Sequence, residues 1–247
     1  MPRTLVTAKA IDTASASTAA PPPAVAPVGA TERIVAAITN AIIERRLMPG
    51  TKLAEQKIAD IFAVSRTLVR QALNQLSRDR LVTLSPARGA SVAMPSVAEA
   101  RQVFEVRVMV ESAMALQLAS RITDAQIAEL RDHLRDEAAA IGRSDVPGRT
   151  RLLADFHAVL ARLLGNDVLA QLLADLLSRS SLIALMYPSA HSAENSQQEH
   201  GQIVDALARR DGPAAASLMA GHIASVERNL RLHPHTADLS AALLPQG

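Results

Sequence analysis

The chain has 247 residues, of which 49% are apolar and 20% charged, and its formal net charge is only +2. This length exceeds that of an average single domain, so we expect two domains with separate cores. The chain has no cysteine, no tryptophan, three phenylalanines and one tyrosine. This composition excludes disulfides, thiolate metal ligands and a cysteine nucleophile, and it argues against a stacking platform for single-stranded nucleic acid.

Residues 1–30 are rich in alanine, serine, threonine and proline and contain few large apolar side chains. Such a segment cannot bury enough apolar surface to offset the entropy of ordering it, so we predict disorder. The alternative is a secretory signal peptide, but the segment has no continuous apolar core. No later apolar run approaches the roughly 18 residues that span a bilayer. We therefore expect a cytoplasmic protein.

The pattern in residues 31–93 predicts short helices followed by a β-hairpin. Apolar residues recur at helical spacing in three stretches, and LVTLSPARGASVA then alternates apolar and polar residues around a turn. This order is typical of a winged helix-turn-helix. The predicted elements are a helix from Glu32 that ends before Pro49, helices over 55–62 and 66–78, the latter capped by Ser65, and a hairpin that turns at 86–89.

The third of these helices has side chains suited to the major groove of DNA. Arg66 and Arg70 are four residues apart and so share one helix face. Arginine can donate two hydrogen bonds to guanine, while Ser65 and Thr67 can donate to phosphate. Taken singly, each arginine is better explained as a solvated surface charge.

Two further features favour DNA over that simpler explanation. Arg88 and Gly89, at the predicted hairpin tip, provide a cation and an uncrowded backbone for a minor-groove or phosphate contact. Residues 31–93 carry ten Lys+Arg against five Asp+Glu, a net charge of +5, whereas residues 94–247 carry fourteen against eighteen, a net charge of −4. A basic domain beside an acidic one is expected of a protein that binds phosphate backbones.

Residues 94–247 are helical in pattern, with breaks at 142–148, 165–166, 188–195 and 211–213. Connections of a few residues imply antiparallel neighbours. The predicted fold is therefore mainly α: an N-terminal winged helix followed by an all-α antiparallel bundle of about six helices.

Three histidines lie within apolar helical patterns on different predicted helices of this bundle: His157, His200 and His222. A single histidine in such a place is more often a core residue than a metal ligand. Three on separate helices can converge on a cavity, where neutral imidazole is a common ligand of zinc or nickel. The remaining histidines lie in polar or terminal contexts and are assigned no role: His133, His191, His233 and His235.

Arg107 and Glu111 stand four residues apart on the first helix of the bundle. One interpretation is a surface ion pair, worth only about 0.3–0.5 kcal/mol. The other, which a family resemblance of this segment implies, is that Arg107 contacts a ligand.

The run PGTKLAEQKIADIFAVSRTLVRQALNQLSRDRLVTLSPARGASV strongly resembles the DNA-binding domain of the GntR family of bacterial transcription regulators. The resemblance implies that Arg66, Arg70 and Gly89 touch operator DNA. Some branches of the family carry an arginine in the preceding helix where this chain has Gln56. The landmarks are Pro49-Gly50, Leu53, Glu55, Ala59, Val64-Ser65-Arg66, Val69-Arg70, Ala72-Leu73, Leu81 and Arg88-Gly89.

The helical segment is similar to the effector-binding domain of the FadR/FCD branch, through VFEVRVMVESAMALQLASR, DFHAVLARLLGN and EHGQIVDALARRDGPAAASLMAGHI. The resemblance implies that the three histidines hold a divalent metal, zinc or nickel. It also implies that Arg107 faces the cavity and pairs with an effector carboxylate, which the planar guanidinium suits.

One position departs from the metal-binding members, which carry a carboxylate or Asn one helical turn before the first histidine. Here that position is Leu153. Asp155 is about 200° around the helix from His157 and is a poor substitute. Two hypotheses remain: a three-histidine site completed by water or effector, and a site that binds no metal.

The predicted function is a ligand-responsive transcription regulator, a repressor by analogy, which binds double-stranded operator DNA as a homodimer. Its domains are a tail (residues 1–30), a winged helix (31–93) and an effector-binding and dimerisation domain (94–247), with a small organic acid as effector. One alternative is a metal-dependent enzyme with Asp155 as base, but HExxH, G-x-S-x-G, P-loop and G-x-G-x-x-G motifs are all missing. A second alternative is an architectural DNA binder that has no effector.

Overall fold

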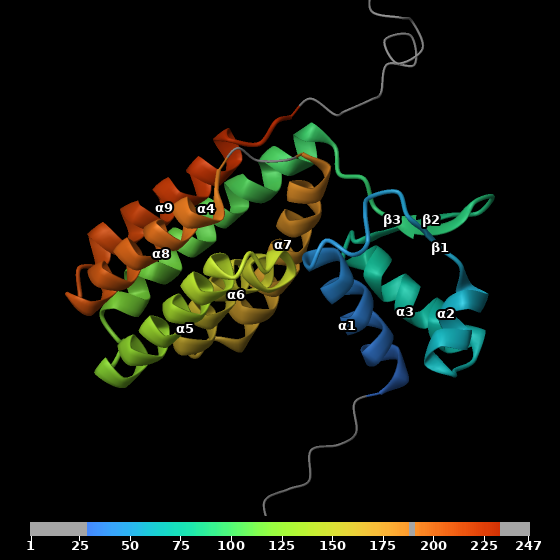
Figure 1. The fold of residues 1–247 in the computed structure, drawn as a ribbon, viewed down its shortest axis with the longest axis horizontal. Coiled ribbons are helices and arrows are strands. Elements are labelled where there is room, and N and C mark those ends of the chain that lie inside the picture. Colours follow the sequence, from blue (N-terminus) through green and yellow to red (C-terminus); the bar gives the residue numbers. More distant parts are fainter. Residues whose placement is uncertain (1–28, 188–190, 233–247) are drawn as a thin grey trace, which may run out of the picture.

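The computed structural model describes residues 29–187 and 191–232. The predictions made for residues 1–28 and for His233 and His235 lie outside this part of the chain. The described part forms a winged helix at one end and a helical bundle at the other (Figure 1). Its elements are α1 (Ala30–Ile43), β1 (Lys52–Leu53), α2 (Glu55–Phe62), α3 (Arg66–Arg78), β2 (Val82–Ser85), β3 (Gly89–Val92), α4 (Val97–Ala119), α5 (Asp124–Gly142), α6 (Val146–Leu163), α7 (Asp167–Met186), α8 (Ala193–Ala208) and α9 (Gly212–Arg228).

Most of the winged helix agrees with its sequence pattern, although α1 begins at Ala30 instead of Glu32 and already ends at Ile43. Helices α2 and α3 have the predicted bounds, and the hydroxyl of Ser65 caps α3 by accepting a hydrogen bond from the amide of Leu68. Strands β2 and β3 form the predicted hairpin. The short strand β1 was not predicted; it pairs antiparallel with β3, which makes the order of the sheet β1-β3-β2.

Helix α3 is amphipathic, and its two faces serve different purposes. Val69, Ala72, Leu73 and Leu76 are buried against α1 and the sheet. Burial of these side chains ties the helix to its core, since each fully buried aliphatic side chain contributes about 1.5–3 kcal/mol. The opposite face, which carries the arginines, is left exposed to solvent.

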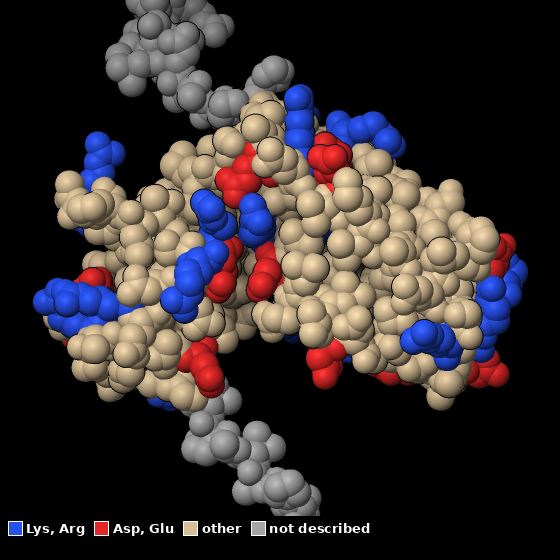
Figure 2. Space-filling model, turned by 180° about the vertical axis from the view of Figure 1, so that it is seen from behind, with Lys and Arg blue, Asp and Glu red and all other residues tan. Residues whose placement is uncertain are grey.

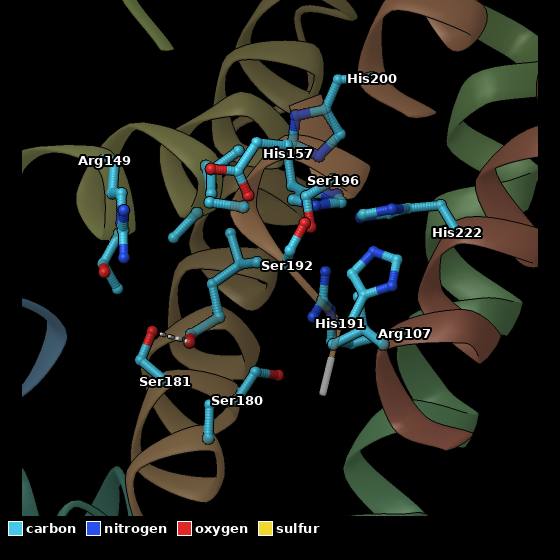
Figure 3. Close-up of a pocket in the computed structure, with 18 of the residues that line it drawn as sticks. Arg107, Arg149, His157, Ser180, Ser181, His191, Ser192, Ser196, His200 and His222 are labelled. Carbon is cyan, nitrogen blue, oxygen red and sulfur yellow. Dashed lines mark hydrogen bonds between the residues drawn. The ribbon is translucent and has the colours of Figure 1, made fainter. Parts of the chain in front are cut away.

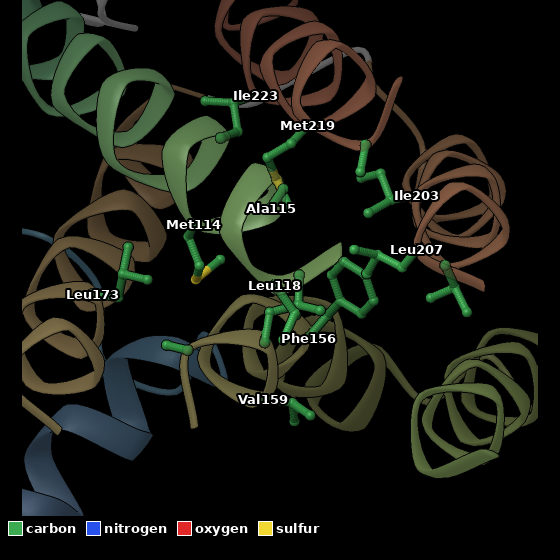
Figure 4. Close-up of a cluster of buried hydrophobic side chains, with 14 of the residues drawn as sticks. Met114, Ala115, Leu118, Phe156, Val159, Leu173, Ile203, Leu207, Met219 and Ile223 are labelled. Atoms are coloured by element: carbon green, nitrogen blue, oxygen red, sulfur yellow. The ribbon is translucent and has the colours of Figure 1, made fainter. Parts of the chain in front are cut away.

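The six helices α4 to α9 form the predicted bundle. Helix α4 packs along α9, and α5 packs against α6 and α8. Figure 4 shows buried side chains of the core that they enclose, among them Met114 and Leu118 of α4 and Met219 and Ile223 of α9. The sequence pattern missed the break between α4 and α5, where Thr123 and Gln126 form a capping box at the start of α5.

Helix α7 joins the two ends of the molecule. Its Leu182 is fully buried in the winged-helix core, whereas Leu173 and Ile183 are buried in the bundle. Length and apolar composition alone would allow α7 to cross a membrane. Its apolar side chains are instead shared between two protein cores, which explains the same composition without a bilayer.

The winged helix also touches the bundle through α1. Helix α1 contacts α6 and α7, and Glu44, immediately after α1, lies 3.6 Å from the guanidinium of Arg151 on α6. The C-terminal end of α1 therefore lies at the boundary between the two parts.

Candidate DNA interface and histidine-lined pocket

The exposed face of α3 presents the two arginines expected to contact DNA. The side chains of Arg66 and Arg70 are 55% and 58% exposed. Both donate to Glu55 of α2, with donor–acceptor distances of 3.0 Å from Arg66 and 2.9 Å from Arg70. The hydrogen bonds from Arg70 and then Arg66 lower the pKa of Glu55. Glu55, to which sequence reasoning gave no role, thus holds the two guanidinium groups side by side.

The hairpin tip lies exposed, as predicted. Gly89 has a φ of 76°, a conformation that residues with a Cβ rarely adopt, and nothing lies within 4 Å of the position a Cβ would take. Arg88 beside it is exposed. Seen from behind, the winged-helix end of the molecule presents several basic side chains together, with acidic ones beside them (Figure 2).

A pocket of about 410 Å³ opens inside the bundle. Figure 3 shows His157, His200 and His222 pointing toward one another at one end, with Arg107 nearby. These residues come from α6, α8, α9 and α4 respectively. The fold therefore brings together all four ligand-binding candidates that sequence reasoning placed in the bundle.

The three histidines form a compact, buried cluster. One ring nitrogen from each lies within 4.8 Å of the others, and the ring centroids are 4.8 Å to 5.3 Å apart. Phe156 stacks on His200 with centroids 3.9 Å apart and planes 12° apart, which limits how the His200 ring can turn.

Each histidine of the cluster has a carboxylate behind it. The Nδ1 atoms of His157, His200 and His222 lie 2.5 Å, 3.0 Å and 2.6 Å from carboxylate oxygens. With every Nδ1 turned to an acid, the Nε2 atoms remain to face the cluster, and Nε2 of His200 is a buried atom without a hydrogen-bond partner among the described residues. Carboxylates commonly orient metal-binding histidines in this way. The three carboxylates belong to Glu111 on α4, Glu137 on α5 and Glu199 on α8.

Burial keeps these imidazoles neutral. It lowers the pKa of His157 and His200, and it lowers that of His222 to about 4. Burial alone would raise the pKa of Glu111, but the charge of Arg107, together with hydrogen bonds from His157 and Arg107, lowers it to about 2. Neutral imidazoles whose ring nitrogens lie within 4.8 Å of one another offer the kind of donor set that zinc and nickel bind. The residues present therefore fit a divalent metal.

Arg107 and Glu111 form a buried pair, not the surface pair considered from the sequence. Their side chains are only 6% and 0% exposed, and Nε of Arg107 lies 2.6 Å from Oε1 of Glu111. Arg107 nevertheless lines the pocket. Its position is compatible with the predicted role toward an effector carboxylate.

Leu153 and Asp155 lie as the helical geometry predicts. Leu153 lines the pocket, so the position one turn before His157 contributes an apolar surface there. Asp155 is exposed and is not among the residues that line the pocket. The carboxylate that might have replaced the missing ligand therefore points elsewhere.

Sequence reasoning missed His191, which also lines the pocket. Its side chain is 5% exposed, and its Nε2 lies 3.1 Å from the Glu199 carboxylate. His191 stands among serine and alanine, outside any helical pattern, so no signal in the sequence marked it. His133 was likewise assigned no role, and its Nε2 lies 3.0 Å from the carbonyl oxygen of Leu152.

Comparisons with known proteins cover both parts of the chain. Residues 30–92 match the family model of bacterial regulatory proteins of the gntR family, and residues 102–225 match that of the FCD domain. The chain is 27% identical over 201 residues to the HTH-type transcriptional repressor RspR of Escherichia coli K12, covering 81% of this chain and 88% of that one. It is also 27% identical over 228 residues to the galactonate operon transcriptional repressor of the same strain, covering 81% and 96%.

Solved structures of transcription regulators are also similar to this chain. A putative GntR transcriptional regulator from Rhodococcus sp. RHA1 is similar with a TM-score of 0.72 and 26% identity, covering 80% of this chain and 95% of that one. The E. coli protein McbR/YncC has the same fold, with a TM-score of 0.71, 18% identity, and coverage of 80% and 94%.

Proposed function

Because this chain belongs to the GntR family of bacterial transcription regulators and carries an FCD domain, we propose that it is a cytoplasmic, homodimeric repressor controlled by a small organic acid. As a DNA-binding transcription regulator it is not an enzyme, so the metal-dependent enzyme hypothesis is dropped. The observation that carries the proposal is the pocket in which three neutral histidines converge beside Arg107. The division into residues 31–93 for DNA and 94–247 for the effector and dimerisation is part of the same proposal.

We assign operator contacts to Ser65, Arg66, Thr67 and Arg70 of the recognition helix and to Arg88 and Gly89 of the wing. Their support is the exposed, basic face of α3 and the open hairpin tip. The arginines would contact guanine and the hydroxyl groups phosphate.

A double substitution tests this assignment. Arg66→Ala with Arg70→Ala should abolish sequence-specific binding in a mobility-shift assay while the circular dichroism spectrum stays unchanged. The matched control is Arg131→Ala with Arg135→Ala, since these arginines are also four apart and exposed, on α5. Unchanged specific binding by the first variant would show that α3 is not the recognition helix.

We assign a divalent metal, zinc or nickel, to His157, His200 and His222, with no carboxylate from position 153. When bound, the metal would supply a positive charge that attracts an effector carboxylate. Each His→Ala variant should lose the metal that elemental analysis detects in wild-type protein after loading and desalting. Asp155→Ala should retain the metal; it is the control because Asp155 is two residues from His157 but does not line the pocket. Wild-type protein that holds no metal after loading would contradict the assignment.

The effector assignment has two supports. Arg107 provides a guanidinium in the pocket, and one relative is named for the galactonate operon, whose sugar acid is a small carboxylate. A thermal-shift screen of small carboxylic acids, with and without metal, should find a stabilising compound. A ligand at about 100 times its dissociation constant stabilises by roughly 2.7 kcal/mol.

The same screen separates the regulator from an architectural DNA binder. A stabilising acid should change the affinity of the protein for operator DNA by about 5- to 150-fold. An architectural protein would bind DNA equally well with and without any acid.

The homodimer is supported by an apolar stripe on α4. Val106, Met109 and Leu116 are large apolar side chains that remain exposed, and their spacing of three and seven residues places them on one helix face. A second copy of the chain would cover them and place two recognition helices in successive major grooves. Met109→Glu should shift the mass measured by analytical ultracentrifugation from dimer to monomer; an unchanged dimer would exclude this face.

A further inference from the structure

The pocket extends beyond the histidines to the boundary between the two domains. Its lining includes Arg149 of α6 and also Arg45, which follows α1 and belongs to the winged helix. Arg149 lies across the pocket from His222 (Figure 3). The volume of about 410 Å³ is within the range of small-molecule sites, roughly 300–1,000 Å³. A ligand that filled the pocket would touch both domains.

The outer end of the pocket has an excess of positive charge. Among the described residues, no carboxylate oxygen lies within 4.0 Å of the side-chain nitrogens of Arg45 or Arg149. Partial burial and then the charge of Arg149 lower the pKa of Arg45. Glu194 is the one acidic residue among those that line the pocket, and it provides a single negative charge against two positive ones. Unpaired like charges in a concave site attract an anion.

The inner end of the pocket is arranged differently. There the charge of Arg107 is matched by Glu111, and the histidines are neutral. In the proposed function this end holds the effector carboxylate, with or without the metal. With the first carboxylate at the inner end, the excess positive charge of Arg45 and Arg149 over Glu194 stays unbalanced unless the same ligand carries a second anionic group.

We infer that the effector is a dianion whose second anionic group is held between Arg45 and Arg149, so that the ligand bridges the two domains. This inference rests on the proposed function, which assigns the first carboxylate to the inner end. The class of ligand is a linear dicarboxylate or a carboxylic acid with a terminal phosphate. Both present oxygen atoms that a guanidinium can bind in pairs.

The bridge would act directly on the orientation of the recognition helix. Arg45 is joined to α1 through a hydrogen bond from its amide to the carbonyl of Ile42, and α1 packs against α3. An anion that ties Arg45 to Arg149 removes their mutual repulsion and restricts the winged helix relative to the bundle. A coupling of this kind changes operator affinity by about 5- to 150-fold.

The experiment compares dianions with monoanions of the same length. Dissociation constants of linear dicarboxylates, ω-phosphorylated carboxylates and the matching monocarboxylates are measured by calorimetry for the full-length wild-type protein, Arg45→Gln and Arg149→Gln. Arg143→Gln is the control, because Arg143 is exposed near the start of α6 but does not line the pocket. The dicarboxylate and phosphate arms identify which anionic group the outer end prefers.

In wild-type protein and in the control, one dianion should bind about 10- to 100-fold more tightly than its monocarboxylate. Both pocket variants should lose this preference while their affinity for the monocarboxylate stays within about two-fold. Equal binding of dianion and monoanion by wild-type protein would overturn the inference and leave the proposed function standing. Failure of every acid to bind would overturn both.

A second measurement tests the bridge itself. The chain has no cysteine, so spin labels can be placed at Ile61→Cys on α2 and Arg131→Cys on α5, both exposed, without any background reaction. Labelled protein is diluted with unlabelled chain so that only distances within one chain are measured. A saturating concentration of the dianion that binds most tightly in calorimetry should narrow the distribution of label-to-label distances. The same dianion should leave it unchanged in the Arg45→Gln background. Equal narrowing in both would show that Arg45 does not join the domains.

Discussion

The carboxylate behind His200 offers the sharpest test of the histidine cluster. Glu137 is fully buried and accepts from Nδ1 of His200, with its two oxygens at 3.0 Å and 3.2 Å. This contact holds the proton on Nδ1 and leaves the lone pair of Nε2 toward the cluster. Glu137→Gln keeps the shape and one carbonyl oxygen but removes the negative charge.

The magnitude follows from what is lost. A hydrogen bond to a charged group contributes about 1.5–3 kcal/mol, whereas one between neutral groups contributes about 0.5–1.5 kcal/mol. The difference, about 1–2 kcal/mol, corresponds to a decrease in metal affinity of roughly 5- to 30-fold. This agrees with the 10- to 100-fold that groups behind metal ligands usually contribute.

The assay is a competition titration of zinc against a chromophoric chelator, with wild-type protein, Glu137→Gln and Glu129→Gln. Glu129 lies on the same helix but is exposed, so its variant controls for the loss of one negative charge. The dissociation constant should rise in the first variant only. If Glu137→Gln binds zinc as tightly as wild-type protein does, the carboxylate does not orient His200 and the reasoning about the cluster is wrong.

Four further predictions concern stability, metal binding and DNA. Leu182→Ala should lower the free energy of unfolding by about 2–5 kcal/mol in urea denaturation, because Leu182 is fully buried in the winged-helix core; a loss below about 1 kcal/mol would contradict this packing. In metal-free protein, the pKa of His222 is about 4 in the folded state against 6.5 in the unfolded chain. Because the unfolded chain takes up the proton first as the pH falls, the free energy of unfolding should be about 3 kcal/mol higher above pH 6.5 than at pH 4. His222→Asn should remove this part of the pH dependence of stability, and a pH dependence identical to that of wild-type protein would refute the lowered pKa of His222. Leu153→Asp should tighten zinc binding in the same competition titration, since it adds a carboxylate to the pocket wall one turn before His157; weaker binding would mean that position 153 does not face the metal. Arg88→Ala should reduce by about 0.9 the slope of log binding constant against log salt concentration, as expected for one lost phosphate contact; an unchanged slope would place the wing away from the backbone.

Much of the architecture follows from local rules that the sequence displays directly. The bounds of α2 and α3, the cap at Ser65 and the hairpin around Gly89 depend on residues that are neighbours in the chain. The capping box at Thr123 shows that even the missed break between α4 and α5 had a local signal. Strand β1 had none, because two residues cannot show a period and pair only when β3 is already in place.

The sites depended on the tertiary structure. Periodicity placed His157, His200 and His222 on apolar helix faces, but it could not show that each meets a carboxylate from another helix or that His191 joins them. It could not decide whether Arg107 and Glu111 are exposed, since that depends on what packs over α4. The sequence could not predict either that Arg45 lines a pocket of the bundle. By itself, the sequence determined most of the helices, the hairpin, the family resemblance and the chemistry available on each helix. The tertiary structure alone decided which side chains share a pocket, because contacts between residues far apart in the chain arise only when helices pack.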